Sequence, residues 1–250
     1  MIRMLVSVRS VEEALLAAAG GADFIDLKEP SAGALGGLPP ATIRAIVQAL
    51  RSRGIALPVS ATIGDLPMRE LPPILAQVQA VGACGVDYVK VGIERHPRAI
   101  EVLDALAGSG WPVVPVFIAD RGIDPRLIAH ACALPFPALM LDTADKRAGS
   151  LFDAVPVEQL QGAMAQARAA GRLFGLAGAL RAEDVPLLRQ LAPDFAGFRS
   201  AVCVADRTAA LCPQRLAALA ALLRDEGVEN RSVPQARSNP ISQTPVQSQP

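Results

Sequence analysis

The chain has 250 residues, of which 51% are apolar, and its 24 acidic residues balance its 24 lysines and arginines. This length fits one large α/β barrel or two small domains, and the apolar fraction is ample for a substantial core. Because the charges balance and no long basic run occurs, the composition argues against nucleic acid or an anionic membrane as partner, whereas small anions remain compatible with it.

Signals for membrane insertion, export and metal binding are absent from the pattern of residues. The apolar stretches are short and broken by proline, glycine or charge, so none predicts a transmembrane helix. The chain opens on a strand-like segment without the basic-then-apolar pattern of a signal peptide, which predicts a cytoplasmic protein. The four cysteines form no CxxC pair and the two histidines fit no metal-ligand spacing, so we expect no metal site.

Short apolar runs and amphipathic segments alternate along the chain. The runs that predict β-strands cover residues 4–8, 24–28, 58–63, 88–92, 113–118, 138–142, 173–177 and 195–200. Ser10 followed by Glu13 predicts a capping box at the first helix, and Asp124 before a proline predicts the start of the fifth. The second helix is expected to open at the prolines 39–40, and further helices are expected over residues 69–82, 97–107, 157–170, 182–191 and 207–224.

This alternation predicts an α/β fold, a single-domain (β/α)8 TIM barrel over residues 1–228. Nearly continuous apolar strands separated by helices indicate a parallel sheet covered on its outside, and eight units fill the length of one barrel. A doubly wound open sheet is the alternative, but the first strand is not followed by a G-x-G-x-x-G turn. From about residue 229 the composition changes to Asn, Ser, Pro and Gln, which predicts a disordered tail over 229–250 without catalytic role.

Lysine is scarce in this arginine-rich chain, and its three positions are informative. Lys28, Lys90 and Lys146 each fall at or just after the end of a strand-like run. In a barrel, the carboxyl ends of the strands form the active site. An amine can lose its proton and attack a carbonyl, whereas a guanidinium stays protonated. The placement predicts amine chemistry at the barrel mouth; the alternative is three surface lysines left by chance.

Two aspartates are expected to join the lysines at the same mouth. Asp26 and Lys28 are two residues apart, so their side chains leave the same, inward face of the second strand, and Asp142 ends the sixth. A structural ion pair would explain Asp26 and Lys28 alone, but not Lys90 and Asp142 as well. Low dielectric and a neighbouring ammonium both favour a neutral amine, and the carboxylates are expected to set which lysine keeps its proton.

An anion site is expected beside these groups. Gly178 and Ala179 follow the seventh strand, and Arg199 and Ser200 end the eighth. Loops after strands 7 and 8 of barrels commonly hold a phosphate with main-chain N–H groups, and Arg199 is expected to add charge-assisted hydrogen bonds. Glycine near barrel strands also occurs merely for packing. Together with an imine-forming lysine, the pattern indicates a phosphorylated carbonyl compound as substrate.

Several blocks of sequence together resemble a known family. A D-x-K-x-P…G-x-L-G block is joined to an S-A-T-x-G-D block, and neither is a generic barrel motif. The matching segments are residues 20–23, 25–30, 33–36, 59–65, 88–92, 141–146, 151–153 and 177–178. With these segments, nearly the whole chain resembles the (5-formylfuran-3-yl)methyl phosphate synthase family.

The resemblance implies a lyase that condenses two molecules of glyceraldehyde 3-phosphate, loses phosphate and water, and closes a furan ring for methanofuran-type one-carbon cofactors. It implies that Lys28 forms the Schiff base and Lys90 accepts a proton, while Asp26, Asp142 and Lys146 line the site. It implies no metal and no organic cofactor.

One segment departs from the family pattern, and other functions stay open. The glycine-rich stretch that follows the last strand in the family is replaced here by residues 200–207, which puts phosphate contacts there in doubt. A class I aldolase acting on another phosphosugar and a non-enzymatic phosphometabolite-binding barrel are the alternatives. The expected partner is a phosphorylated triose, and homo-oligomerisation stays open.

Overall fold

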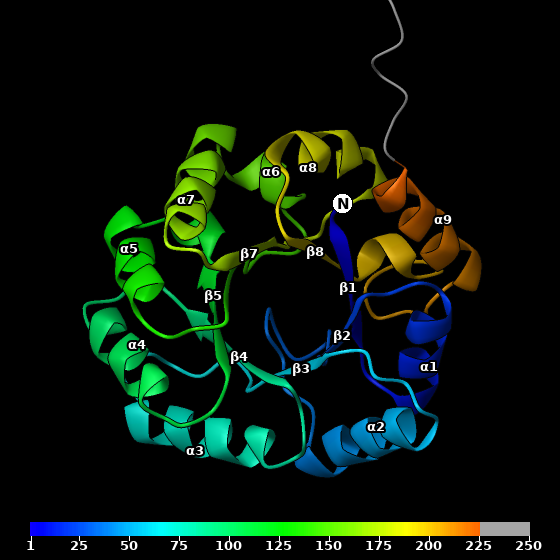
Figure 1. Ribbon diagram of the computed structural model, residues 1–250, viewed down its shortest axis with the longest axis horizontal. Coiled ribbons are helices and arrows are strands. Elements are labelled where there is room, and N and C mark those ends of the chain that lie inside the picture. The colour runs from blue at the N-terminus through cyan, green and yellow to red at the C-terminus, as the bar shows by residue number, and fades with distance from the viewer. Residues whose placement is uncertain (226–250) are drawn as a thin grey trace, which may run out of the picture.

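Eight parallel strands form a closed barrel in the computed structural model, which describes residues 1–225 (Figure 1). The strands are β1 (Arg3–Val8), β2 (Phe24–Leu27), β3 (Val59–Thr62), β4 (Tyr88–Ile93), β5 (Val113–Ile118), β6 (Ala138–Asp142), β7 (Leu173–Leu176) and β8 (Phe195–Phe198). Each pairs with the next in chain order, and β8 closes the ring by pairing with β1. The predicted (β/α)8 barrel is confirmed, whereas the predicted tail at 229–250 lies outside the described residues.

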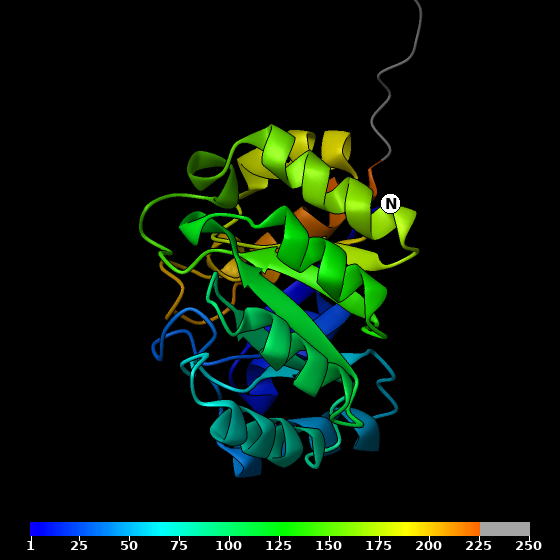
Figure 2. The same ribbon diagram turned by 90° about the vertical axis from the view of Figure 1, so that its left-hand side faces the viewer.

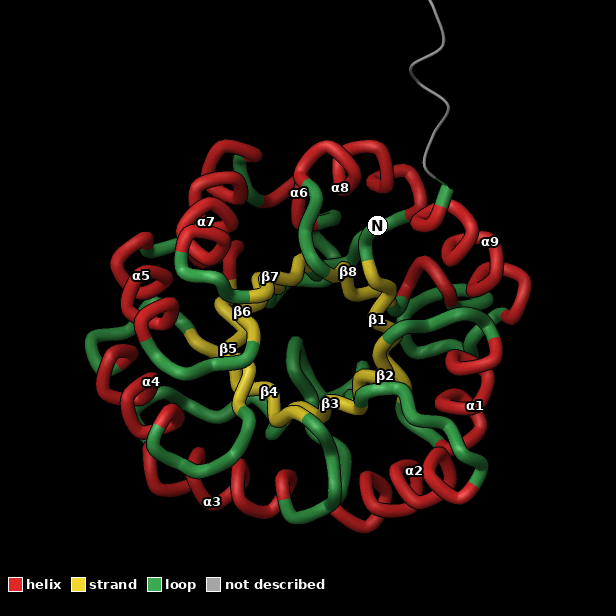
Figure 3. Tube along the Cα trace, viewed as in Figure 1, coloured by secondary structure: helices red, strands yellow, loops and turns green. Residues whose placement is uncertain are grey.

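A ring of helices surrounds the ring of strands (Figure 3), and the side view shows the strands inclined between the helices (Figure 2). The helices are α1 (Val11–Ala19), α2 (Pro40–Ser52), α3 (Leu71–Gly82), α4 (Ala99–Ala107), α5 (Pro125–Ala133), α6 (Leu151–Ala154), α7 (Val157–Ala169), α8 (Val185–Leu191) and α9 (Pro213–Arg224). Single 3-10 turns cover Ala119–Arg121, Ala182–Asp184 and Ser200–Val202. The larger apolar core lies between the strands and these helices.

The helix starts follow the capping residues of the sequence, with two corrections. The side chain of Ser10 accepts from Glu13 N and that of Asp124 from Arg126 N, as predicted. The reciprocal half of the capping box is absent, because the carboxylate of Glu13 instead accepts from Arg9 N. The predicted helix over 207–224 begins only at Pro213, since the preceding residues form a loop whose Leu211 bridges to Cys203.

Small residues leave room for large ones inside the barrel. Gly175 on β7 pairs in register with Phe195 on β8, and a Cβ at Gly175 would lie 2.0 Å from the ring of Phe195. The rings of Phe24 and Phe195 stand 5.7 Å apart between centroids. Because barrel interiors are filled by layers of side chains, the missing side chain at Gly175 allows these rings to close the amino-terminal end.

We expect Gly175→Ala to destabilise the protein by about 1–3 kcal/mol, because the new methyl group overlaps the ring of Phe195. Gly162→Ala is the matched control. Gly162 is exposed within α7 and a Cβ there meets nothing within 4 Å, so alanine should stabilise the helix by about 0.5–1 kcal/mol. Chemical denaturation followed by circular dichroism measures both. Equal effects of the two substitutions would contradict the proposed packing.

Candidate active site

A cavity at the carboxyl ends of the strands gathers the chemistry-bearing residues. The titratable side chains that line it comprise five cations and two carboxylates: Lys28, Lys90, Lys146, Arg199, Arg207, Asp26 and Asp142. Gly178, Ala179 and Ser200 line the same cavity. The structure therefore brings every site residue predicted from the sequence to one mouth. It also adds Arg207, which the sequence pattern predicts to lie inside a helix.

Asp26 is almost fully buried and is held from both neighbouring strands and from β4. Its oxygens accept hydrogen bonds from Ser7 Oγ at 3.0 Å, Ser60 Oγ at 2.6 Å and Lys90 Nζ at 3.0 Å. Ser7 and Ser60 are its register partners on β1 and β3. Burial by itself would raise the pKa of Asp26, but the ammonium groups of Lys90 and Lys28 outweigh it and the pKa is lowered. Asp26 is therefore an ionised acceptor in a fixed orientation.

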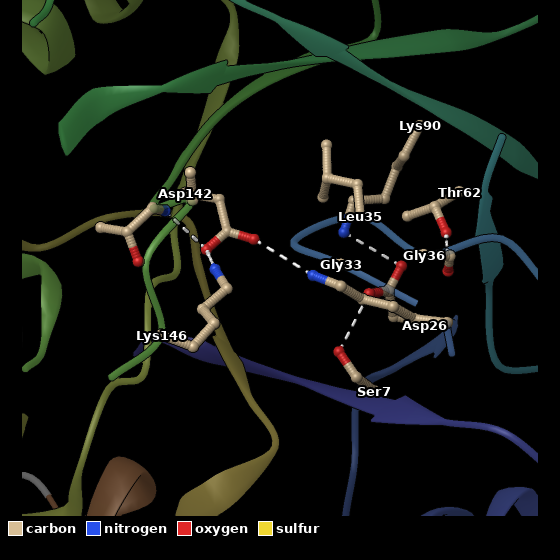
Figure 4. A network of polar contacts seen from close by, with 12 residues as sticks. Ser7, Asp26, Gly33, Leu35, Gly36, Thr62, Lys90, Asp142 and Lys146 are labelled. Carbon is tan, nitrogen blue, oxygen red and sulfur yellow. Dashed lines mark hydrogen bonds and ion pairs between the residues drawn. The ribbon is translucent and has the colours of Figure 1, made fainter. Parts of the chain in front are cut away.

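Asp142 connects the other two lysines. It accepts from Lys28 Nζ at 3.2 Å and from Thr143 N at 2.8 Å, and it pairs with Lys146 (Figure 4). Burial opposes its ionisation, yet Lys146 and Lys28 hold the pKa of Asp142 well below its usual range. Burial also lowers the pKa of Lys146 to about 8, despite the attraction of Asp142. Lys146 thus changes its protonation near neutral pH.

Lys28 and Lys90 pair across the barrel, whereas Lys146 pairs with Asp142 four residues before it in the chain. Lys28 does not pair with Asp26, two residues before it, but with Asp142 on β6. Lys90 on β4 pairs with Asp26 on β2. The relative exposure of Lys28 is 7% and that of Lys90 is 3%, so neither amine is a surface group. The alternative of three chance surface lysines is wrong.

Arg199 does not fill the phosphate-binding role predicted for it. Its guanidinium donates to both carboxylate oxygens of Glu13, at 2.6 and 3.0 Å. It also donates to the carbonyl oxygens of Ser7, Arg207 and Ala209. These bonds use all five of its N–H groups, so none is left for a phosphate. No spacing of residues along the chain indicates that Glu13, at the start of α1, captures this side chain.

The loop between β2 and α2 folds back over the mouth. Leu35 N donates to the carboxylate of Asp65 at 3.1 Å. Thr62 Oγ1 donates to the carbonyl of Gly36 at 2.8 Å (Figure 4). These bonds join the G-x-L-G block to the S-A-T-x-G-D block. The side chain of Leu35 is buried with the apolar residues of the barrel interior, and a Cβ at Gly92 would lie 2.9 Å from it. The two sequence blocks are therefore joined by hydrogen bonds that hold Leu35, and the β2–α2 loop that carries it, in the barrel mouth.

Neither a membrane-spanning helix nor a cluster of metal ligands occurs among the described residues. Of the helices within residues 1–225, none combines the length and apolar character that crossing a membrane requires. Within the same residues, no group of three or more His, Cys, Asp or Glu side chains is arranged to hold a metal ion.

Fold and site define a (β/α)8-barrel protein with buried lysines and carboxylates at its mouth. The family model of 4-HFC-P synthase matches residues 4–220. A Methylorubrum extorquens protein, provisionally named (5-formylfuran-3-yl)methyl phosphate synthase, is 39% identical over 216 residues, covering 86% of this chain and 89% of the relative. The synthase of Methanopyrus kandleri is 37% identical over 216 residues, covering 80% and 89%. The chain therefore belongs to the 4-HFC-P synthase family of enzymes, as the sequence blocks predicted.

Solved structures agree on the fold. Phosphoribosyl anthranilate isomerase of Thermus thermophilus superposes with a TM-score of 0.63 at 24% identity, covering 89% of this chain and 98% of that one. The 3-hexulose-6-phosphate synthase of Salmonella typhimurium has a TM-score of 0.58 at 18% identity, covering 89% and 100%. At this identity the likeness concerns the barrel alone.

We expect Glu13→Gln to lower the free energy of unfolding by about 3–5 kcal/mol, because it leaves the largely buried guanidinium of Arg199 without its counter-charge. Glu12→Gln is the matched control, since Glu12 precedes it on α1 and is exposed. Urea denaturation of both variants gives the comparison. A loss below about 1 kcal/mol for Glu13→Gln, the size of an exposed pair, would show that the pair does not hold the end of β8.

Proposed function

We propose that this protein is a (5-formylfuran-3-yl)methyl phosphate synthase that condenses two molecules of glyceraldehyde 3-phosphate through a lysine Schiff base. The observation that carries the proposal is the pair of buried amines at one mouth, Lys28 and Lys90, each held by an aspartate from another strand. The names of the family and its relatives support this furan product, which would serve the assembly of methanofuran-type one-carbon cofactors, as the family resemblance implies.

In this mechanism Lys28 is the nucleophile. Its amine attacks the carbonyl carbon of the first triose, and loss of water gives an imine that draws electrons from the neighbouring carbon. The amine must first give up a proton. Asp142 contacts both Lys28 and Lys146, so a proton can pass from Lys28 to Lys146, whose pKa of about 8 leaves a growing neutral fraction to accept it as the pH rises toward that value.

Lys90 is the base of the next step. In its neutral form it removes a proton from the carbon beside the imine, and the resulting enamine attacks the aldehyde carbon of the second triose. Asp26 holds Lys90 at 3.0 Å and is itself fixed by two serine hydroxyls, which sets the direction in which the amine approaches. Elimination of water and one phosphate and closure of the ring then give the aromatic framework, and hydrolysis of the imine releases the product and restores the amine of Lys28.

Product analysis tests the proposed function. Purified protein given only glyceraldehyde 3-phosphate should release inorganic phosphate and an ultraviolet-absorbing furan aldehyde. A class I aldolase would share the imine but stop after forming the carbon–carbon bond, so a non-aromatic sugar phosphate as sole product would favour it and refute the synthase. A phosphometabolite-binding barrel would leave the substrate unchanged.

We expect Lys28→Arg to abolish trapping of substrate by borohydride and to lower kcat at least about 1000-fold, because a guanidinium forms no imine. Lys90→Arg is the internal control, since it removes the base but leaves the nucleophile. That variant should still give a borohydride-stable adduct at Lys28 while losing furan formation. Peptide mass spectrometry locates the adduct. A trapped adduct in Lys28→Arg would refute the assigned role.

The pH dependence should report Lys146. Burial lowers the pKa of Lys146 to about 8, so its amine is protonated below that pH and accepts no proton from Lys28. We expect the rate of imine formation to rise as the pH passes through about 8 and to level off above it. In Lys146→Met this limb should disappear and the rate should fall. An unchanged profile in Lys146→Met would assign the limb to another group.

A further inference from the structure

Arg207 lies over the mouth although no sequence signal places it there. It stands in the loop between the 3-10 turn Ser200–Val202 and α9, and its side chain lines the same cavity as Lys28 and Lys146. The residue is partly buried, whereas its neighbours Asp206 and Thr208 are exposed. Moving a cationic side chain from solvent into a cavity that already holds other cations costs free energy, so an anion in the cavity is needed to compensate this cost.

The guanidinium of Arg207 is only sparsely bonded within the described chain. Its single hydrogen bond among residues 1–225 goes from Nη2 to the carbonyl of Gly33 at 3.2 Å, and no carboxylate there forms an ion pair with it. Burial lowers the pKa of Arg207 while the more distant Asp142 raises it, and arginine keeps its charge. Four N–H groups of a partly buried cation therefore lack a protein acceptor in the described structure.

Hydrogen bonds from Arg199 fix the main chain of the loop that carries Arg207. Arg199 Nε donates to the carbonyl oxygen of Arg207 at 2.8 Å, and its Nη2 donates to that of Ala209 at 2.8 Å. Because Glu13 neutralises Arg199, this anchor is a rigid ion pair that fixes the loop main chain on both sides of Thr208. Arg199 holds the loop, and the loop presents Arg207 to the cavity.

The charge of the cavity favours an anion. Apart from Arg199, which Glu13 neutralises, its lining carries four cations against two carboxylates, and both carboxylates are already paired with lysines. A guanidinium with free, parallel N–H groups matches two oxygens of a phosphate. Gly178 and Ala179 approach from the β7 end of the same cavity without bulky side chains.

We propose that Arg207, and not Arg199, binds the phosphate group of the triose whose carbonyl reacts with Lys28. The inference rests on the proposed function for the identity of the triose. It adds a specificity-determining residue, because Arg207 selects phosphorylated over unphosphorylated aldehydes. Through Gly33 the same guanidinium contacts the β2–α2 loop that carries Leu35, so the bound phosphate lies beside this loop at the mouth.

Calorimetric titration with inorganic phosphate tests the inference without relying on turnover. We expect Arg207→Gln to weaken phosphate binding about 10- to 100-fold, as removal of charged hydrogen bonds implies, and Arg207→Lys to weaken it less. Arg147→Gln is the matched control. Arg147 is exposed on the β6–α6 loop and does not line the cavity, so its loss should change binding less than about twofold.

Borohydride trapping with two aldehydes supplies the second measurement. In Arg207→Gln, the concentration of glyceraldehyde 3-phosphate needed for half-maximal adduct at Lys28 should rise about 10-fold or more. Trapping of unphosphorylated glyceraldehyde should stay within about twofold of the unchanged protein. Equal losses for both aldehydes, equal losses in Arg147→Gln, or no phosphate binding by the unchanged protein would overturn the inference. If phosphate binding behaves as expected but no furan forms, the synthase proposal fails and the assignment of Arg207 stands.

Discussion

The site depends on one constraint, which is that charges buried in the barrel mouth must be paired there. Lys28, Lys90, Asp26 and Asp142 are all nearly inaccessible to solvent, and leaving any of them unpaired would cost several kcal/mol. The pairing is met across the barrel, with Asp26 serving Lys90 and Asp142 serving Lys28. Each amine is thereby fixed by a strand other than its own, and distortion of one strand end would disturb the whole cluster.

Barrel geometry explains why these four side chains meet. Alternate strands contribute side chains to the same interior layers of a (β/α)8 barrel. The cluster comes from the ends of β2, β4 and β6, while Gly197 on β8 lines the cavity without a side chain, where a Cβ would lie 3.1 Å from Ala177 and Met140. Ser7 and Ser60, from the strands flanking β2, complete the hydrogen bonds of Asp26. A site of this kind therefore needs small residues at selected positions as much as it needs charged ones.

Arg199 and Arg207, two arginines after β8, have different roles because they differ in how many N–H donors the protein itself already occupies. Arg199 uses all its donors on Glu13 and on main-chain oxygens, so it acts as a brace. The loop it braces is the one that the sequence pattern predicts as the beginning of α9. The main-chain carbonyl of Arg207 accepts from Arg199 instead of from a helix N–H. The carbonyl of Ala209 also accepts from Arg199, because residue 213, its partner in a continued helix, is a proline without an N–H, and the helix starts at Pro213. Pro213 thus sets the helix start, and Arg199 sets the place of Arg207.

The sequence by itself determined the barrel, because the alternation of apolar strands and helices is local, and it determined the mouth residues, because strand ends can be read from the same pattern. The scarcity of lysine was enough to identify Lys28, Lys90 and Lys146. Only the tertiary structure decided which aspartate pairs with which lysine. It also decided that Arg199 forms its ion pair with Glu13, while the side chain of Arg207 reaches the cavity. Those outcomes depend on contacts between residues far apart along the chain, which ring closure creates and which spacing in the sequence does not encode.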